Sequence, residues 1–173
     1  MMARTDINCF YGHWPFRRIR DNSFDNLKKR HAENGISSGY ISSLNSIFYN
    51  DPFEGDEELH DIIKGSNYRH ILTVNPTLPG FAGDIQNGKK FFDIKGVRIY
   101  PGYHGYDLES LMLDRLCEIL TDCKLPLYLT LRMEDERLNH IIYPTAISTD
   151  SVSRFIVSLS DVSSEYLAFV NMI

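Results

Sequence analysis

The stretch GVRIYPGYHGYDLESLMLDRLCEILTDCKLPLYLTL, residues 96–131, decides the fold class. Its apolar ends, 96–100 and 127–131, are typical of short strands bounded by turn residues. Between them, residues recur at helical spacing on one face, with acidic residues on the other. That face comprises Leu108, Leu111, Met112, Arg115, Leu116, Ile119 and Leu120. A strand, a helix and a second strand about 30 residues after the first have the size of one βαβ unit.

The same alternation extends to both ends of the chain. Further strands are predicted at 6–10, 39–43, 70–74 and 167–170. Helices are predicted at 24–34, at about 57–64, within 83–92, and after a Ser148 cap through Val152, Phe155, Ile156 and Leu159. Steps of about 30 residues predict an α/β fold with a parallel sheet. An open doubly wound sheet and part of a closed barrel both fit, and length favours the open sheet because a closed barrel takes ~250 residues.

Composition limits the classes of partner. The 173 residues, 43% of them hydrophobic, predict one domain, 1–173. A net charge of −5 argues against a nucleic-acid partner, because proteins bind nucleic acids through basic surfaces. The N-terminus lacks an apolar signal, and no stretch approaches the ~20 apolar residues that span a bilayer, so no membrane partner is expected. Three cysteines at unrelated spacings, Cys9, Cys117 and Cys123, indicate reduced thiols and a cytoplasmic protein.

Polar residues follow several predicted strands, where ligands meet parallel sheets and barrels. They are His13, Asn75, His104, Arg132, Glu134 and His140. A lone loop histidine is more often a surface residue than a base, and the charged run 132–137 also suits a solvated helix start. Only Arg132 and Glu134 in that run, together with His140, are kept as candidates.

Alternation along the strands predicts which side chains share a face. The sets are Asp6, Asn8 and Phe10, opposite Ile7 and Cys9; Arg98 and Tyr100, opposite Val97 and Ile99; and Tyr128, Thr130 and Arg132, opposite Leu127, Leu129 and Leu131. Two arginines directed at one mouth would bind a carboxylate or phosphate through bidentate hydrogen bonds. Arg98 could instead pair with Asp6, because a buried charge needs a partner.

Four segments together resemble a known family. They are TDINCFYGHWPFR (5–17), NPTLPG (75–80), GVRIYPGYHGY (96–106) and LRMEDER (131–137). In this order they are similar to members of the amidohydrolase superfamily, in its amidohydrolase-related, decarboxylase-like branch. The resemblance implies a parallel (β/α) TIM-barrel-like fold of the metal-dependent hydrolase type. About six strands are predicted, so the barrel is expected to be incomplete at its C-terminal end, and its open edges allow a homo-oligomer.

The resemblance also implies a metal pair held by a His-x-His motif at the end of the first strand. Asn8 and Phe10 occupy the matching positions, and neither is a zinc ligand of the usual kind. No cofactor is therefore expected, although divalent metals such as zinc serve the family.

The expected function is an amidohydrolase-like hydrolase acting on a small carboxylate-bearing molecule, with decarboxylation as a second enzymatic possibility. His13, His104 and Glu134 are the candidates for proton transfer. The candidates for substrate binding are Asn8, Arg98, Tyr100, Arg132 and His140. The alternative is a non-catalytic anion-binding or scaffolding protein that kept the fold and lost catalysis.

Overall fold

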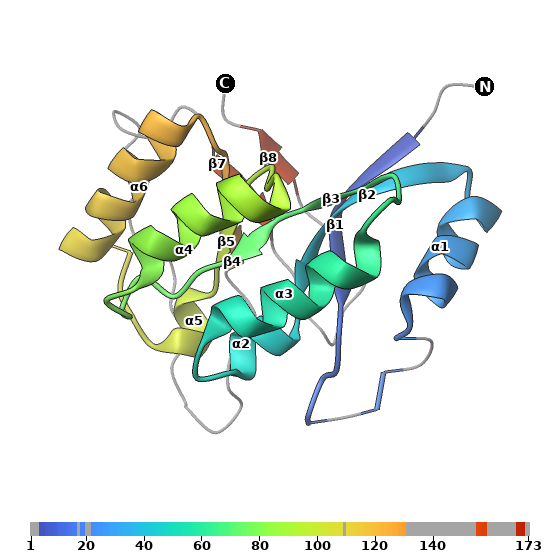
Figure 1. Cartoon of the computed structure of the whole chain (residues 1–173), viewed down its shortest axis with the longest axis horizontal. Coiled ribbons are helices and arrows are strands. Elements are labelled where there is room, and N and C mark those ends of the chain that lie inside the picture. Colours follow the sequence, from blue (N-terminus) through green and yellow to red (C-terminus); the bar gives the residue numbers. More distant parts are fainter. Residues whose placement is uncertain are drawn as a thin grey trace. The chain divides into compact units, whose positions relative to one another are not determined.

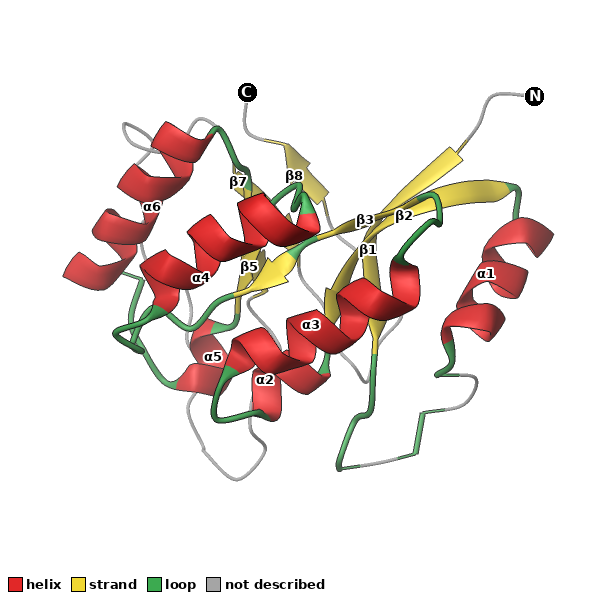
Figure 2. Ribbon diagram, in the orientation of Figure 1, coloured by secondary structure: helices red, strands yellow, loops and turns green. Residues whose placement is uncertain are grey.

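The computed structural model describes residues 4–16, 18–19, 22–108, 110–130, 155–158 and 169–171. Helices and strands alternate along the chain (Figures 1 and 2). They form two compact units, the first made of residues 1–73 with 87–95 and the second of 74–86 with 96–173. Each unit is considered by itself.

The first unit is built on three parallel strands in the order β1-β2-β3. Its elements are β1 (Arg4–Tyr11), α1 (Phe24–Glu33), β2 (Ile36–Ser43), α2 (Asn45–Phe48), α3 (Pro52–Ile63), β3 (Tyr68–His70), β4 (Leu72–Thr73) and the π-helix η1 (Gly88–Phe92). The core between sheet and helices consists of Cys9, Phe24, Ile41, Leu59, Ile63 and Tyr68. The adjacent parallel β1 and β2 confirm the expected βαβ unit.

Sequence signals for helix ends hold in this unit. The side chain of Ser23 accepts a hydrogen bond from the Asn26 amide at 3.3 Å and caps α1. Gly35, at φ +70°, ends that helix as expected. Helix α3 begins earlier than predicted, because Asp51 caps it and Pro52 takes the first helical position, where its missing N–H costs nothing.

A β-bulge in β1 overturns one predicted alternation. Asp6 pairs with Gly39 while Cys9 pairs with Ile41, so the two β1 residues between these pairs lie opposite a single residue of β2. An extra residue shifts the side chains that follow it to the opposite face. Asp6 and Cys9 therefore lie on the same side of the sheet, contrary to the expectation that they oppose each other.

The second unit contains α4 (Phe81–Asn87), β5 (Val97–Ile99), α5 (Pro101–His104), α6 (Leu111–Cys123), β6 (Leu127–Thr130), β7 (Phe155–Ser158) and β8 (Phe169–Asn171). Strands β5, β6 and β7 are parallel neighbours. Helix α6 packs through Leu113, Leu116 and Leu120, whereas Leu111 is 85% exposed. The predicted apolar face was wrong at Leu111 and Met112, because both lie on the exposed first turn.

Two predictions near the C-terminus are also wrong. The helix predicted through Phe155 and Ile156 is the strand β7 at those residues, parallel to β6. Its short run FIVS is apolar and contains β-branched residues, so it suits a buried strand as well as a helix face. Strand β8 was expected to be parallel, but it pairs antiparallel with β7 and ends the sheet order.

The architecture is thus mixed α/β with mainly parallel sheets. Within the described ranges, the strands form two sheets and not one closed barrel. None of the helices in those ranges is long and apolar enough to cross a bilayer.

Candidate functional site

The first part of the candidate site follows the carboxyl end of β1. Gly12, at φ +128°, turns the chain, and a Cβ there would lie 2.9 Å from Asn45 Oδ1. Glycine is required for this conformation and this close approach. The His13 amide donates a hydrogen bond to Asn45 Oδ1 at 3.0 Å, and the Leu44 amide donates to the Tyr11 carbonyl at 2.7 Å. The loop is thereby fixed to the start of α2.

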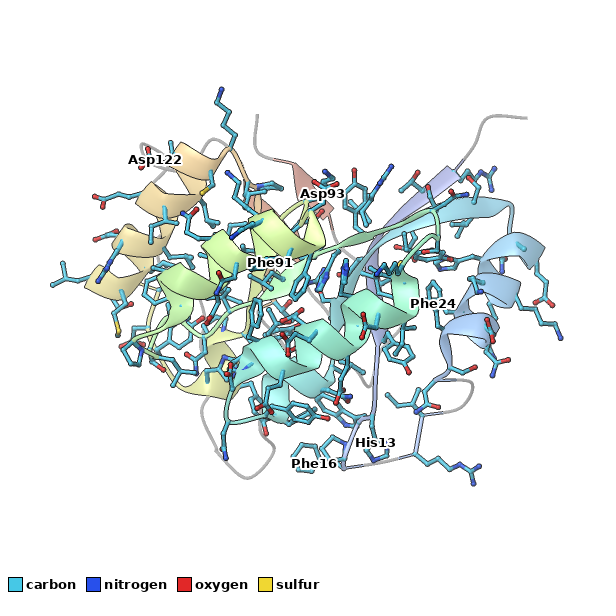
Figure 3. All side chains as sticks on the ribbon, in the orientation of Figure 1. His13, Phe16, Phe24, Phe91, Asp93 and Asp122 are labelled. Carbon is cyan, nitrogen blue, oxygen red and sulfur yellow. The ribbon has the colours of Figure 1, made fainter. Side chains whose placement is uncertain are left out.

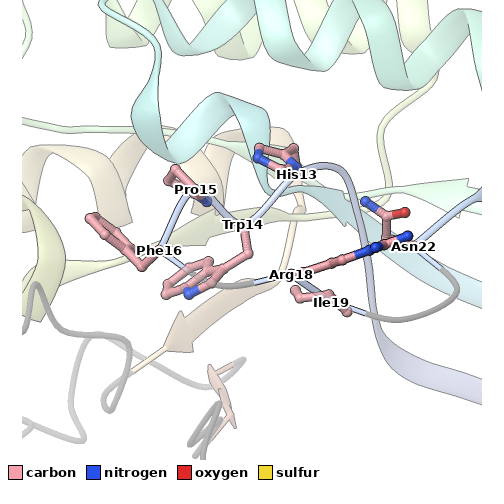
Figure 4. A pocket seen from close by; sticks show the side chains of 7 residues that line it. All are labelled: His13, Trp14, Pro15, Phe16, Arg18, Ile19 and Asn22. Atoms are coloured by element: carbon pink, nitrogen blue, oxygen red, sulfur yellow. The ribbon is translucent and has the colours of Figure 1, made fainter.

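This loop encloses an open hollow of about 410 Å³ (Figure 4). Its lining residues are His13, Trp14, Pro15, Phe16, Arg18, Ile19 and Asn22. Trp14 is buried and meets Phe16 and Phe48 edge to face, at ring separations of 5.6 and 5.3 Å. His13 and Arg18 are exposed and add an imidazole and a guanidinium to the aromatic wall. His13 and Phe16 extend from the same loop (Figure 3). We call this site the Trp14 hollow.

The second unit carries a buried arginine on β5. Arg98 is 0% exposed, its Nη1 lies 3.5 Å from Thr130 Oγ1, and its guanidinium lies 5.1 Å from the centre of the Tyr128 ring. The register pairs Arg98 with Tyr128 on the neighbouring strand. These three side chains therefore share the face that strand alternation predicts. The aromatic ring offsets part of the cost of burying the charge.

An aromatic cluster follows β5. Tyr100 is fully buried, and the short helix α5, which the sequence did not predict, carries Tyr103 and His104. The His104 ring meets Tyr100 and Tyr103 edge to face, at 6.1 and 5.8 Å, and stacks on Tyr106 at 6.5 Å. Gly105, at φ +70°, ends α5 and lets Tyr106 fold back beside His104. His104 is thus half-buried among tyrosines and is not a free surface histidine.

Replacing Tyr106 with phenylalanine is expected to raise the free energy of unfolding by about 1–2 kcal/mol, because its buried hydroxyl has no hydrogen-bond partner among the described residues. Burial also raises the pKa of Tyr106 above its ordinary value. Above about pH 10, Tyr106 of the unfolded chain loses its proton while Tyr106 of the native chain keeps it. The free energy of unfolding therefore falls as the pH rises through this range. Urea unfolding between pH 7 and 10.5 should show a smaller alkaline loss for Tyr106→Phe. An unchanged or lower stability of the variant at pH 7 would contradict the expectation.

The structure reaches only part of the predicted site. Arg132, Glu134 and His140 lie outside the described residues. Asn8 is half-buried within the β1 bulge, and its backbone N–H donates a hydrogen bond to Asp6 Oδ1 at 2.8 Å. The carboxylate of Asp6 contacts His31, a partner that the sequence analysis did not identify.

Other residues of the site were missed from sequence. Trp14, Phe16 and Arg18 line the Trp14 hollow, whereas His13 is the residue of this loop that the sequence predicts. The available signal was the run His13–Phe16, which places three rings and a proline directly after a glycine that turns the chain.

The end of β1 does not offer a metal site of the superfamily type. Phe10 has no donor atom, and Asn8 has only an amide oxygen, which a first-row metal binds weakly compared with imidazole or carboxylate. His13 and His104 belong to different units. These donors do not fit the usual metal pair.

No protein-family model matches the chain, and no curated protein matches it by sequence. Among solved structures, 2,6-dihydroxybenzoate decarboxylase from Rhizobium matches with a TM-score of 0.59 and 11% identity, over 82% of this chain and 53% of that one. The same type of enzyme in complex with 2,6-dihydroxybenzoate matches with a TM-score of 0.61 and 11% identity, over 79% and 53%.

A second decarboxylase also matches. It is 5-carboxyvanillate decarboxylase from Novosphingobium aromaticivorans, solved with manganese and 4-hydroxy-3-methoxy-5-nitrobenzoic acid. The TM-score is 0.50 at 20% identity, over 65% of this chain and 36% of that one. The chain shares the fold of part of these decarboxylases. At 11–20% identity, this likeness extends to the fold alone. The chain spans about half the length of the dihydroxybenzoate decarboxylase structures.

Proposed function

We propose that the chain forms part of a TIM-barrel enzyme of the amidohydrolase type that acts on a small aromatic carboxylate. The observation that carries the proposal is the Trp14 hollow. In it, the rings of Trp14 and Phe16 lie in the same lining as the guanidinium of Arg18 and the imidazole of His13. A volume of about 410 Å³ lies in the range of small-molecule sites. Aromatic walls suit a planar ring, and Arg18 suits its carboxylate.

Decarboxylation is favoured over hydrolysis within this proposal. The similar structures are decarboxylases whose names specify aromatic carboxylic acids. In such a reaction the bond between ring and carboxylate breaks, carbon dioxide leaves, and the ring carbon that keeps the electron pair takes a proton. A histidine can supply that proton. We assign this role to His13 in the hollow, with His104 as the corresponding candidate of the second unit.

The remaining roles follow from the strand ends. Apart from the Trp14 hollow, Arg98 and Tyr100 of the second unit, both fully buried, and Arg132 remain the candidates for carboxylate binding that the sequence predicts. Asn8 of the first unit and His140 remain the candidates for polar contacts. Glu134 is the acidic candidate for proton transfer. All of these positions belong to strands or to segments that follow them, where (β/α) barrels place their chemistry.

A non-catalytic anion-binding protein is the second candidate function. Asn8 and Phe10, at the positions where the resemblance places metal-binding histidines, favour it. Such a protein would bind a carboxylate and release no carbon dioxide.

Calorimetric titration with 2,6-dihydroxybenzoate and with resorcinol, which lacks only the carboxylate, tests the proposal. We expect the acid to bind and resorcinol to bind weakly, because the hollow is proposed to hold the carboxylate. Arg18→Met should weaken binding of the acid by about tenfold to a hundredfold, since a hydrogen bond to a charged group is lost. The matched control is Arg69→Met, an exposed arginine of β3 that does not line the hollow.

Equal binding of acid and resorcinol, or unchanged affinity in Arg18→Met, would contradict the carboxylate site. Release of carbon dioxide from the bound acid, reduced in His13→Asn, would favour the decarboxylase. Binding without release, with or without added manganese, would favour the non-catalytic alternative.

A further inference from the structure

A second group of functional side chains lies between the sheet and α1 in the first unit. It consists of Asp6 and Cys9 from β1 and His31 from the last turn of α1. One ligand atom from each lies within 4.8 Å of the others. None of these residues lines the Trp14 hollow, and the proposed function gives them no role. We call this group the Asp6–Cys9–His31 cluster.

The β1 bulge and a glycine create the cluster. The extra residue between Asp6 and Cys9 brings both side chains to the face that α1 covers. Opposite them, Gly39 leaves room, since a Cβ there would lie 2.6 Å from Cys9 Sγ and 2.9 Å from the Tyr68 ring. A glycine in the interior of a strand lowers stability, but at position 39 it leaves the space that Cys9 Sγ occupies.

The imidazole of His31 is held at both nitrogens. Nδ1 lies 2.7 Å from the Tyr68 hydroxyl, and Nε2 lies 3.2 Å from Asp6 Oδ2. Metal-binding histidines usually have a partner of this kind on the nitrogen that does not ligate. Two tautomers fit these distances: Tyr68 donates to Nδ1 while Nε2–H donates to Asp6, or Nδ1–H donates to Tyr68 and the lone pair of Nε2 faces the carboxylate of Asp6. The second tautomer is the one that binds a cation at Nε2.

Burial and charge suit a small dication. Cys9 and His31 are 3% and 7% exposed, while the side chain of Asp6 remains 31% exposed and leaves a route from solvent. A thiolate and a carboxylate this close together concentrate negative charge, which a dication neutralises.

We propose that Asp6, Cys9 and His31 bind a zinc ion, with Tyr68 as a positioning residue for His31. Sulfur, imidazole nitrogen and carboxylate oxygen form a common donor set for zinc, and water can take the fourth tetrahedral position. For bonds of ~2.0–2.3 Å, tetrahedral ligands lie roughly 3.3–3.8 Å apart. The Asp6–His31 distance of 3.2 Å is close to that range. On binding, the Cys9 thiol loses its proton to solvent, and Nε2 binds as the neutral base.

Cobalt(II) is the probe that tests this site, because it replaces zinc and reports its ligands by absorption. The full chain, freed of metal with a chelator, is titrated with cobalt chloride. We expect one equivalent to give a thiolate-to-cobalt charge-transfer band with intense visible bands of tetrahedral cobalt. One equivalent of zinc should abolish both signals. Absence of the charge-transfer band in the wild-type chain would overturn the proposal, whatever the variants do.

The variants assign the ligands. Cys9→Ser should remove the charge-transfer band, and Cys9→Ser and His31→Gln should each weaken zinc binding about 100-fold or more, because a direct ligand is lost. Tyr68→Phe should weaken it about tenfold, since only the support of His31 is lost. The control is the double variant Cys117→Ser/Cys123→Ser, which removes the other thiols and should keep the band. A band that survives Cys9→Ser and disappears in the double variant would also overturn the site.

Discussion

Replacing Asp56 with alanine is expected to lower the free energy of unfolding by about 3–5 kcal/mol. Asp56 is 0% exposed, and its Oδ1 lies 2.7 Å from Nε2 of His70, which is 2% exposed. Its Oδ2 accepts the Thr73 amide at 3.1 Å. One buried carboxylate thus connects α3 to β3 and to β4. Its removal leaves an imidazole nitrogen and an amide without partners in a site that water does not reach.

The surroundings of His70 make this loss larger. Nδ1 of His70 has no hydrogen-bond partner among the described residues, so Asp56 is the polar contact on which that ring depends. The remaining neighbours are rings, with Phe92 stacked on His70 at 5.5 Å and on His60 at 4.7 Å. Burial raises the pKa of Asp56, while hydrogen bonds from His70 and Thr73 oppose that rise. The carboxyl group therefore tolerates its site only through these partners.

Urea unfolding followed by circular dichroism measures the effect. The matched control is Asp61→Ala, an exposed acid of the same helix, which should change stability by less than about 0.5 kcal/mol. Asp56→Asn keeps the shape and an acceptor for Thr73, so it should cost less than Asp56→Ala. A loss below about 1 kcal/mol in Asp56→Ala would mean that the pair contributes little to the native state.

Local signals were enough to predict most of the fold. The Ser23 cap and Gly35 bound α1 at the expected residues, and the apolar runs placed β1, β2, β5 and β6. Each of these features depends on a few neighbouring residues, so spacing and capping rules apply directly. The side chains of Arg98 and Tyr128 also share a face as alternation predicts, because β5 and β6 are regular there.

Features that depend on distant residues were not predicted. The β1 bulge arises from the pairing of β1 with β2, and the local sequence around Ile7 and Asn8 does not predict it. The strand β7 has helical spacing in its sequence, and pairing with β6 decides its conformation. The Asp6–Cys9–His31 cluster requires both the β1 bulge and the space that Gly39 leaves for Cys9 Sγ, so no motif within one segment could predict it. The bulge, the conformation of β7 and the cluster therefore depend on pairing between segments, which residue spacing within one segment does not reveal.

Gly55→Ala should lower the free energy of unfolding by about 2 kcal/mol or more, although alanine in a helix normally improves stability by about 1 kcal/mol over glycine. A Cβ at Gly55 in α3 would lie 2.5 Å from the Ser46 amide nitrogen and 2.8 Å from its Cα in α2. These are backbone atoms, so no side-chain rotation relieves the overlap. The two helices would have to separate, and Ser46 would move from the neighbouring Asp56.

Gly83→Ala in α4 is the matched control, because a Cβ there meets no atom within 4 Å. It should raise the free energy of unfolding by about 0.4–1 kcal/mol, since only the conformational freedom of the unfolded chain changes. Thermal and urea unfolding of both variants measure the two signs side by side. Stabilisation by Gly55→Ala would mean that α2 and α3 do not approach as closely as described. Opposite signs from one substitution would show that the contact with Ser46, and not helix propensity, determines the residue at position 55.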